Sequence, residues 1–205
     1  MTLCLGFLAS HNGTNVQAIV DACKSGLLDA EPRVVISNNS KAGVLERARR
    51  EGVPHRHLSG KTHSDPADLD HAVAATLEEH GVNLVVMAGY MKLLGPETVA
   101  RYKDRILNTH PALLPRFGGK GMFGPQVHEA VLAAGETETG VTVHLADEEY
   151  DRGPIVSQRT VPVLPDDTPQ TLSVRVLAAE HALFVETLRG ISTGEIDLDA
   201  LAKRT

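Results

Sequence analysis

Cysteine and aromatic residues are scarce in this sequence, and each shortage excludes a class of protein. The two cysteines, Cys4 and Cys23, form no paired pattern of the kind found in zinc sites or secreted disulfide frameworks. Both lie in apolar patterns, so we expect them to be buried, reduced core residues. Aromatic residues make up 3% of the chain and tryptophan is absent, which disfavours a stacking surface for single-stranded nucleic acid.

Long hydrophobic runs and excess positive charge are also missing. No stretch approaches the roughly 20 apolar residues of a membrane span, and the short apolar run from Leu3 lacks the basic segment that precedes a signal sequence. The formal net charge is -6, which argues against broad binding to a phosphate backbone. We therefore expect a cytoplasmic protein that binds neither membrane nor nucleic acid.

What is present is an alternation of apolar segments with strand and helix spacing. The patterns predict strands at 3–9, 33–37, 55–58, 82–87, 106–108, 140–145 and 155–163, and helices at 16–26, 42–50, 66–80, 96–102, 127–134 and 167–189. Residues 116–124 are rich in glycine and indicate a mobile loop. The fold class is α/β: a doubly wound, mostly parallel sheet with helices on both faces, in a single domain spanning 1–205. Ligands are expected at the carboxyl ends of the strands.

The first turn between strand and helix, Ser-His-Asn-Gly-Thr-Asn at 10–15, can bind a phosphate group. Gly13 permits close approach of the backbone, and the start of the following helix offers free N–H groups and the positive end of a dipole. The turn is neither a dinucleotide-binding fingerprint nor a Walker A loop, so it does not predict either cofactor. A helix start merely capped by Thr14 or Asn15 explains the same residues.

A second polar cluster follows the strand at 106–108. Asn108 and His110 are two residues apart, so a strand places both side chains on one face. An amide donor beside an imidazole can stabilise the oxyanion of an acyl-transfer intermediate, and the imidazole can move protons near neutral pH. A structural role for the pair is equally consistent with the residues alone.

Asp151 is the third candidate, in the segment Tyr-Asp-Arg-Gly-Pro at 150–154. A carboxylate close to His110 would favour the imidazolium and raise its pKa. An ordinary turn aspartate ahead of Gly-Pro accounts for the same residue.

Taken together, these motifs resemble the folate-dependent phosphoribosylglycinamide formyltransferase family of purine synthesis. The resemblance runs from about residue 3 to about residue 188. It rests on the segments 10–19, 88–94, 108–115, 140–144 and 151–155. Asn-x-His-Pro-x-Leu-Leu-Pro with a downstream aspartate is typical of folate-linked formyltransferases and hydrolases in general, and the Gly-Thr-Asn turn narrows the match.

The resemblance implies a role for each matching residue. Asn108 would hold the formyl oxygen, His110 would be the protonated group that stabilises the oxyanion and supplies a proton, and Asp151 would keep His110 charged. The ribose phosphate would bind Asn12, Gly13, Thr14 and Asn15, the glycinamide part would contact Glu180, and the pterin pocket would be lined by Met91, Lys92, Leu93 and Leu94 together with Asn108.

The implied reaction is transfer of a formyl group from 10-formyltetrahydrofolate to the amine of 5-phosphoribosylglycinamide, by direct attack and without a metal. The phosphate-binding half would be about 1–105 and the folate-binding and catalytic half about 106–205, in a monomer or homodimer. The chain departs from the family at His11, at Lys92, and at Pro66, which stands near a folate-binding arginine. Lys120 in the glycine-rich loop could reach the phosphate or be solvated.

Three other interpretations share parts of this pattern. A formyltetrahydrofolate hydrolase would use the same chemistry with water as acceptor, but that family carries an additional N-terminal domain. The formyltransferase acting on methionyl-tRNA carries a C-terminal RNA-binding domain, and this chain is acidic. A catalytically dead folate- or nucleotide-binding module would not need Asn108, His110 and Asp151 together. His128 and His144 lie near the site in sequence and could support it by hydrogen bonds.

Overall fold

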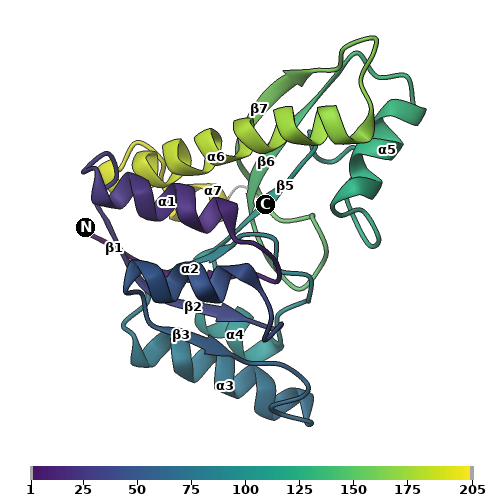
Figure 1. Cartoon of the computed structure of the whole chain (residues 1–205). Coiled ribbons are helices and arrows are strands. Elements are labelled where there is room, and N and C mark those ends of the chain that lie inside the picture. Colours follow the sequence, from purple (N-terminus) through teal and green to yellow (C-terminus); the bar gives the residue numbers. More distant parts are fainter. Residues whose placement is uncertain (1, 204–205) are drawn as a thin grey trace.

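The computed structural model describes residues 2–203 and is built on a seven-stranded sheet in the order β3-β2-β1-β4-β5-β6-β7 (Figure 1). The strands are β1 (Leu3–Leu8), β2 (Ala30–Ser37), β3 (His55–His57), β4 (Leu84–Met87), β5 (Ile106–His110), β6 (Glu138–Leu145) and β7 (Ile155–Pro162). The first five pair in parallel, whereas β6 and β7 are antiparallel to their neighbours. The predicted α/β class, with a parallel first part and a mixed second part, is confirmed.

Each predicted helix is present, with shifted ends. The helices are α1 (Thr14–Lys24), α2 (Gly43–Glu51), α3 (Pro66–Glu79), α4 (Pro96–Arg101), α5 (Pro125–Ala133), α6 (Pro169–Thr193) and α7 (Leu198–Ala202). Four of them, α3, α4, α5 and α6, carry proline in the first turn, where no backbone donor is lost. The short α7 follows a capping aspartate, Asp197, and was not predicted because five residues carry too little periodicity.

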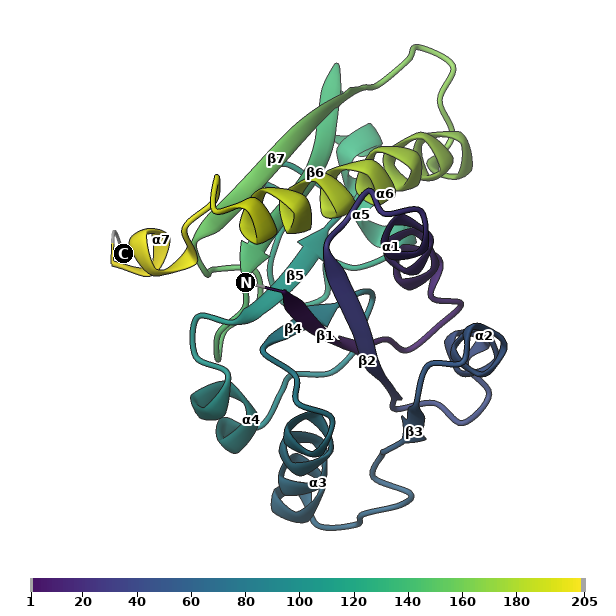
Figure 2. The same ribbon diagram turned by 90° about the vertical axis from the view of Figure 1, so that its left-hand side faces the viewer.

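The two faces of the sheet are covered by different helices, as Figure 2 shows. Alternate residues of a strand point to opposite faces: Val86 of β4 packs in the core formed with α1, α2 and α6, whereas its neighbour Val85 packs in the core formed with α3 and α4. Burying one such side chain contributes roughly 1.5–3 kcal/mol. Burial on both faces explains why these strands read as continuous apolar runs.

Strand order determines where a ligand site can form. β1 lies between β2 and β4, so the chain leaves the carboxyl end of β1 toward one edge of the sheet and the carboxyl end of β4 toward the other. Two loops that diverge in this way leave a crevice between them. The turn at 10–13 and the turn at 88–95 border that crevice.

Both cysteines are free, but the prediction that they are fully buried is wrong. Cys4 and Cys23 are only half-buried, because Cys4 lies near the start of β1 and Cys23 in the last turn of α1, where the core thins. Burial still raises the pKa of the Cys23 thiol to about 11, so it is a poor nucleophile at neutral pH. Among residues 2–203, no helix has the length and apolar content needed to cross a membrane.

Candidate active site

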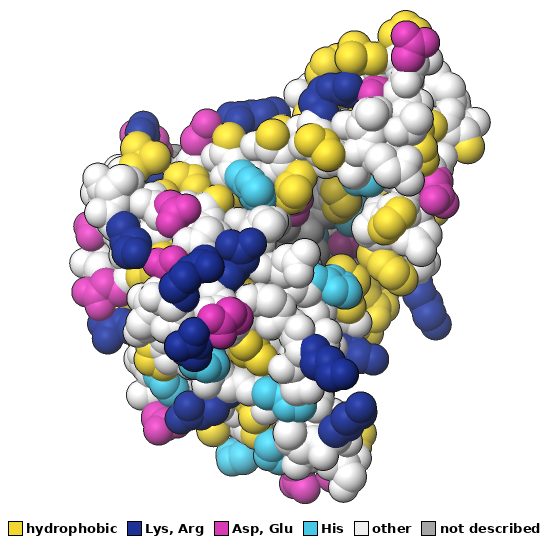
Figure 3. Space-filling view, in the orientation of Figure 1, with side chains coloured by type: hydrophobic (Ala, Val, Ile, Leu, Met, Phe, Trp, Pro, Cys, Tyr) yellow, Lys and Arg dark blue, Asp and Glu magenta, His cyan; other side chains and the backbone are white. Residues whose placement is uncertain are grey.

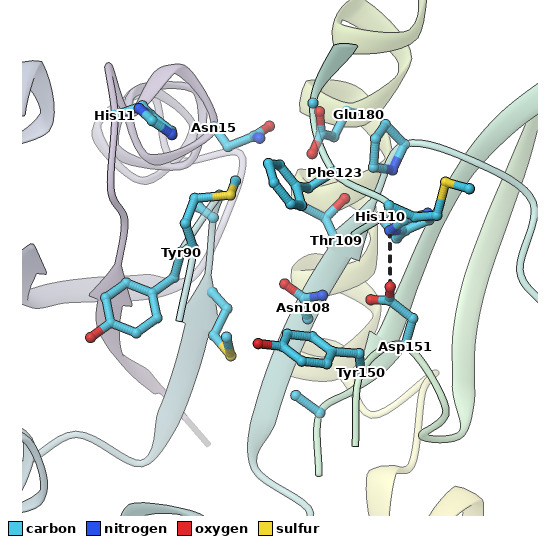
Figure 4. A pocket seen from close by; sticks show the side chains of 18 of the residues that line it. His11, Asn15, Tyr90, Asn108, Thr109, His110, Phe123, Tyr150, Asp151 and Glu180 are labelled. Carbon is cyan, nitrogen blue, oxygen red and sulfur yellow. Dashed lines mark ion pairs between the residues drawn. The ribbon is translucent and has the colours of Figure 1, made fainter. Parts of the chain in front are cut away.

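A cavity of about 770 Å³ opens at the carboxyl ends of β1, β4 and β5. Its walls are the turn after β1, the turn after β4, the end of β5, the segments before α5 and between β6 and β7, and one side of α6. Figure 3 shows the surface hollowed at this place, and Figure 4 shows the side chains around it. Every residue predicted for catalysis, phosphate binding, glycinamide binding or folate binding lines this one cavity.

Asn108 and His110 project from the last residues of β5. They alternate with Thr109 along the strand, and the antiparallel pairing places Asn108 directly opposite His144 of β6. Directly opposed residues of two antiparallel strands lie on the same face and within contact distance. The sheet register therefore adds His144 to the pair that the sequence pattern predicts.

His110 is 3% exposed, and both of its ring nitrogens face acceptors. Nε2 lies 2.7 Å from the carbonyl oxygen of Phe117, and Nδ1 lies 3.4 Å from Oδ2 of Asp151. Two acceptors suit the doubly protonated ring. Burial nevertheless lowers the pKa of His110, and His144 adds to this, so that Asp151 and the Phe117 carbonyl offset the effect only in part. Asp151 acts in the predicted direction, but desolvation outweighs it.

Asp151 is held in a backbone conformation that few residues adopt. Its φ of 57° lies in the left-handed region, which aspartate tolerates better than most side chains. Oδ2 accepts the backbone N–H of Gly119 at 2.9 Å, and Oδ1 lies 3.6 Å from Nε2 of His144. Burial raises the pKa of Asp151, but the neighbouring imidazoles of His144 and His110 and the Gly119 N–H hold it below its usual value. The group is therefore a carboxylate at neutral pH.

Asn108 is bonded to the imidazole that the register brings opposite it. Its Nδ2 lies 3.0 Å from Nε2 of His144, and Nδ1 of the same ring lies 2.9 Å from the carbonyl oxygen of Leu145. His144 is 1% exposed. The suggestion that His144 supports the site by hydrogen bonds is consistent with this geometry.

The turn after β1 presents unsatisfied backbone donors to the cavity. Gly13, the N-cap of α1, has φ 69° and no side-chain cap, so the first N–H groups of the helix are left for a ligand. A Cβ at Gly13 would lie 2.3 Å from Cγ2 of Val44, so no other residue fits without displacement. This geometry supports the phosphate-binding interpretation better than that of a capped turn, because no side chain occupies the donors.

Neighbouring elements hold the turn in place. The N–H of Val44 donates to the His11 carbonyl at 3.1 Å, and Nε of Arg47 donates to the Asn12 carbonyl at 2.7 Å. The N–H of Met91 donates to Oγ of Ser10 at 2.8 Å. The last bond links the turns after β1 and β4 across the crevice, so the two binding segments are connected directly.

Glu180 reaches the cavity from α6 and faces Asn15 and Thr109 (Figure 4). It is 9% exposed, and burial raises its pKa, while the side chains of Thr109 and Asn15 act in the opposite direction. Among the residues described, Oδ1 of Asn15 is buried and has no partner. This part of the cavity therefore offers acceptors to a ligand that carries hydrogen-bond donors.

The turn after β4 supplies an apolar part of the wall. Met91 is 37% exposed and Leu93 48% exposed, and both line the cavity with Lys92 and Leu94. Pro66 lies outside the cavity and borders a second one of about 580 Å³, which also contacts Lys61 and Lys92. Lys120 lines the first cavity from the glycine-rich loop.

Sequence reasoning missed several lining residues. They are Tyr90, Thr109, Met122, Phe123, Tyr150 and Val176. Most lie beside a residue that was predicted, so proximity to a motif was the available signal. His128, 5% exposed, also lines the cavity; burial and then His110 lower its pKa. Across residues 2–203, no cluster of three or more His, Cys, Asp or Glu side chains is arranged to hold a metal ion, and a metal-free site stays a prediction.

This combination of a doubly wound sheet, a cavity at its switch point and a buried Asn-His-Asp set defines an acyl-transfer class of site. The sequence family described as formyl transferase matches residues 5–188. The chain is 36% identical to a phosphoribosylglycinamide formyltransferase of Haemophilus influenzae, over 95% of this chain and 89% of that protein. It is 40% identical to a chloroplastic phosphoribosylglycinamide formyltransferase of Vigna unguiculata, over 91% of this chain, but spans only 60% of that relative's length.

A solved structure gives the same result for the fold. Glycinamide ribonucleotide transformylase 1 from Symbiobacterium toebii superposes with a TM-score of 0.88 at 39% identity, covering 94% of this chain and 89% of the other. The chain belongs to the formyl transferase family.

Proposed function

We propose that this protein transfers a formyl group from 10-formyltetrahydrofolate to the amine of 5-phosphoribosylglycinamide. The observation that carries the proposal is a single cavity with two different walls. Asn108, His110 and Asp151 meet on one wall, and the uncapped start of α1 lies on the other. The first wall suits acyl transfer, and the second suits a phosphate.

The acceptor substrate has groups that match the second wall. Its phosphate would take the free N–H groups at residues 13–16, where the helix dipole favours an anion. Its ribose hydroxyls and glycinamide N–H groups are donors, which match the carboxylate of Glu180 and the unpartnered Oδ1 of Asn15. This arrangement aims the amine toward the end of β5.

The folate would lie against the turn after β4. Met91, Leu93 and Leu94 present apolar surface to the cavity, as a flat aromatic ring system requires. Lys92 in the same turn offers a positive charge near the rim. The formyl group would then point at Asn108 and His110.

In the chemical step the amine nitrogen attacks the formyl carbon, and the carbonyl oxygen becomes an oxyanion. An N–H of Asn108 and the imidazolium of His110 would stabilise it. The bond from carbon to the folate nitrogen then breaks; His110 supplies a proton to that nitrogen and the former amine releases one, so the proton balance closes. Since burial lowers the pKa of His110 in the free protein, the new negative charge favours the imidazolium most strongly as the transition state forms.

The Phe117 carbonyl must yield during this cycle. It accepts from Nε2 of His110 at 2.7 Å, and Phe117 has φ 56°, a costly conformation for a bulky side chain. A formyl oxygen or the folate nitrogen would replace this carbonyl as the partner of His110. The strain at Phe117 favours that exchange.

The deciding experiment measures folate product from 10-formyltetrahydrofolate, with and without glycinamide ribonucleotide, and measures the formylated nucleotide in parallel. The expected result is product only with the nucleotide, in equal amounts of both products. Folate product without the nucleotide would assign the protein as a hydrolase. Binding of both ligands by folded protein without turnover would leave a binding module.

A further inference from the structure

His144 is an enclosed imidazole that the proposed chemical step does not use. It is 1% exposed and does not line the cavity, so it cannot touch a substrate there. It does contact two residues that line the cavity: Asn108 through Nδ2 at 3.0 Å, and Asp151 through Oδ1 at 3.6 Å. Any influence on the reaction must pass through one of these two.

The hydrogen bonds of His144 determine its tautomer. A carbonyl oxygen can only accept, so the contact at 2.9 Å with Leu145 requires a proton on Nδ1. The amide nitrogen of Asn108 can only donate, so the contact at 3.0 Å requires a bare Nε2. Both conditions are met by one species, the neutral ring protonated at Nδ1.

This tautomer also determines which way the Asn108 amide points. With a bare Nε2 opposite, the NH₂ group faces His144 and the oxygen faces away. Figure 4 shows the nitrogen of Asn108 on the side of His110 and Asp151, and the oxygen on the opposite side. The donor of Asn108 therefore lies on the same side as the imidazole of His110. An amide rotated by half a turn would present an acceptor there and repel an oxyanion.

We propose that His144 is a positioning residue that selects the catalytic orientation of the Asn108 amide through its neutral, Nδ1-protonated ring. The proposal rests on the proposed formyl transfer, since it assigns a role in that same site. It explains why a buried imidazole lies directly opposite Asn108 in the sheet register.

Protonation of His144 would remove the selection. A proton on Nε2 would face the Asn108 NH₂ group, so the amide would turn to offer its oxygen, and Asp151 would gain a second cation. The titratable groups that face His144 are Asp151, from the segment between β6 and β7, and His110 of β5, whose pKa a charge on His144 lowers. The same proton would therefore turn Asn108 and disfavour the imidazolium of His110. Activity should fall on the acid side through His144.

The test compares two variants with a matched control. His144→Leu removes the acceptor, and His144→Gln keeps an oxygen near the position of Nε2 but cannot titrate. The control is His80→Gln, which also replaces a half-buried imidazole bonded to a backbone carbonyl (Nδ1 to Thr76 at 2.8 Å) but lies at the end of α3. The kcat, the KM of each substrate and the midpoint of thermal unfolding are measured for each protein from about pH 5 to pH 9.

We expect His144→Leu to lower kcat about 100-fold, as loss of an oxyanion donor does, with each KM within about twofold of wild type. His144→Gln should keep most of the activity at neutral pH and lose part of the acid-side decline that wild type and His80→Gln share. An unchanged kcat in His144→Leu overturns the proposal. So does an acid limb in His144→Gln identical to that of wild type.

Nitrogen NMR of the imidazole provides a readout that does not depend on turnover. The expected spectrum shows a protonated Nδ1 and a bare Nε2 for His144 at neutral pH, with one Asn108 amide proton protected from exchange. A protonated Nε2 at neutral pH would overturn the inference even in an active enzyme. If the tautomer is as expected but no formyl transfer occurs, the proposed function has failed and the geometry stands.

Discussion

The two walls of the cavity are built on different physical principles. The catalytic wall consists of side chains that are almost fully enclosed: His110 is 3% exposed and His144 1%. The binding wall consists of backbone donors at 13–16 and of side chains that face solvent, such as Leu93 at 48%. In the enclosed wall each polar atom has a fixed partner, so one substitution should change the chemistry. In the open wall solvent can replace lost contacts, so substitutions should mainly weaken binding.

His110→Ala tests the contrast most severely. The variant removes the oxyanion partner and the proton donor together, so kcat should fall by about 10³-fold or more, since each of these effects alone contributes on the order of 10²–10⁴. Both ligands should still bind, because the opposite wall is intact. Steady-state kinetics with calorimetric binding measurements checks this. A loss of binding equal to the loss of turnover would contradict the division between walls.

Asp151→Asn should have the next largest effect. Asp151 raises the pKa of His110 against the effect of burial, so removing its charge lowers that pKa further and leaves less imidazolium at any pH above it. We expect kcat to fall about 10–100-fold, roughly one to two pKa units of lost stabilisation, with small changes in KM. Proton NMR titration of His110 gives the direct measurement. A His110 pKa equal to that of wild type would remove Asp151 from this role.

Gly13→Ala should act on the open wall. The added Cβ meets Cγ2 of Val44 at 2.3 Å and the residue would keep φ 69°, so the turn must shift. The KM of the phosphate-bearing substrate should rise about tenfold, equivalent to about 1.4 kcal/mol, while kcat at saturation changes little. The double variant with Val44→Ala relieves the contact and should recover part of the affinity. An unaltered KM would place the phosphate elsewhere.

Lys120→Ala should have the smallest effect. Lys120 is exposed in the glycine-rich loop and forms no ion pair within residues 2–203, so solvent screens its charge. We expect less than about a threefold change in the KM of either substrate, as for a single exposed charge pair. A tenfold rise for the phosphate-bearing substrate alone would show that the loop lysine closes onto the phosphate, and the open wall would then be less tolerant than proposed.

Local patterns predicted the elements and the motif residues of this protein well. The alternation of apolar residues located each strand to within a few positions, and the motifs at 10–15 and 108–115 named residues that line one cavity. They failed where the signal was short or distant. The helix at Leu198–Ala202 was too short to show a period, and Cys4 and Cys23 were assigned full burial that their positions at element ends do not provide.

By itself the sequence determined the α/β class, the order of elements and the identity of the polar residues at the strand ends, because these depend on periodicity and on the preferences of neighbouring residues. Only the tertiary structure decided that His144 lies opposite Asn108, that a loop carbonyl accepts from His110, and that burial outweighs Asp151 in determining the pKa of His110. Sheet register and desolvation depend on segments far apart in the chain. No local pattern contains their sum.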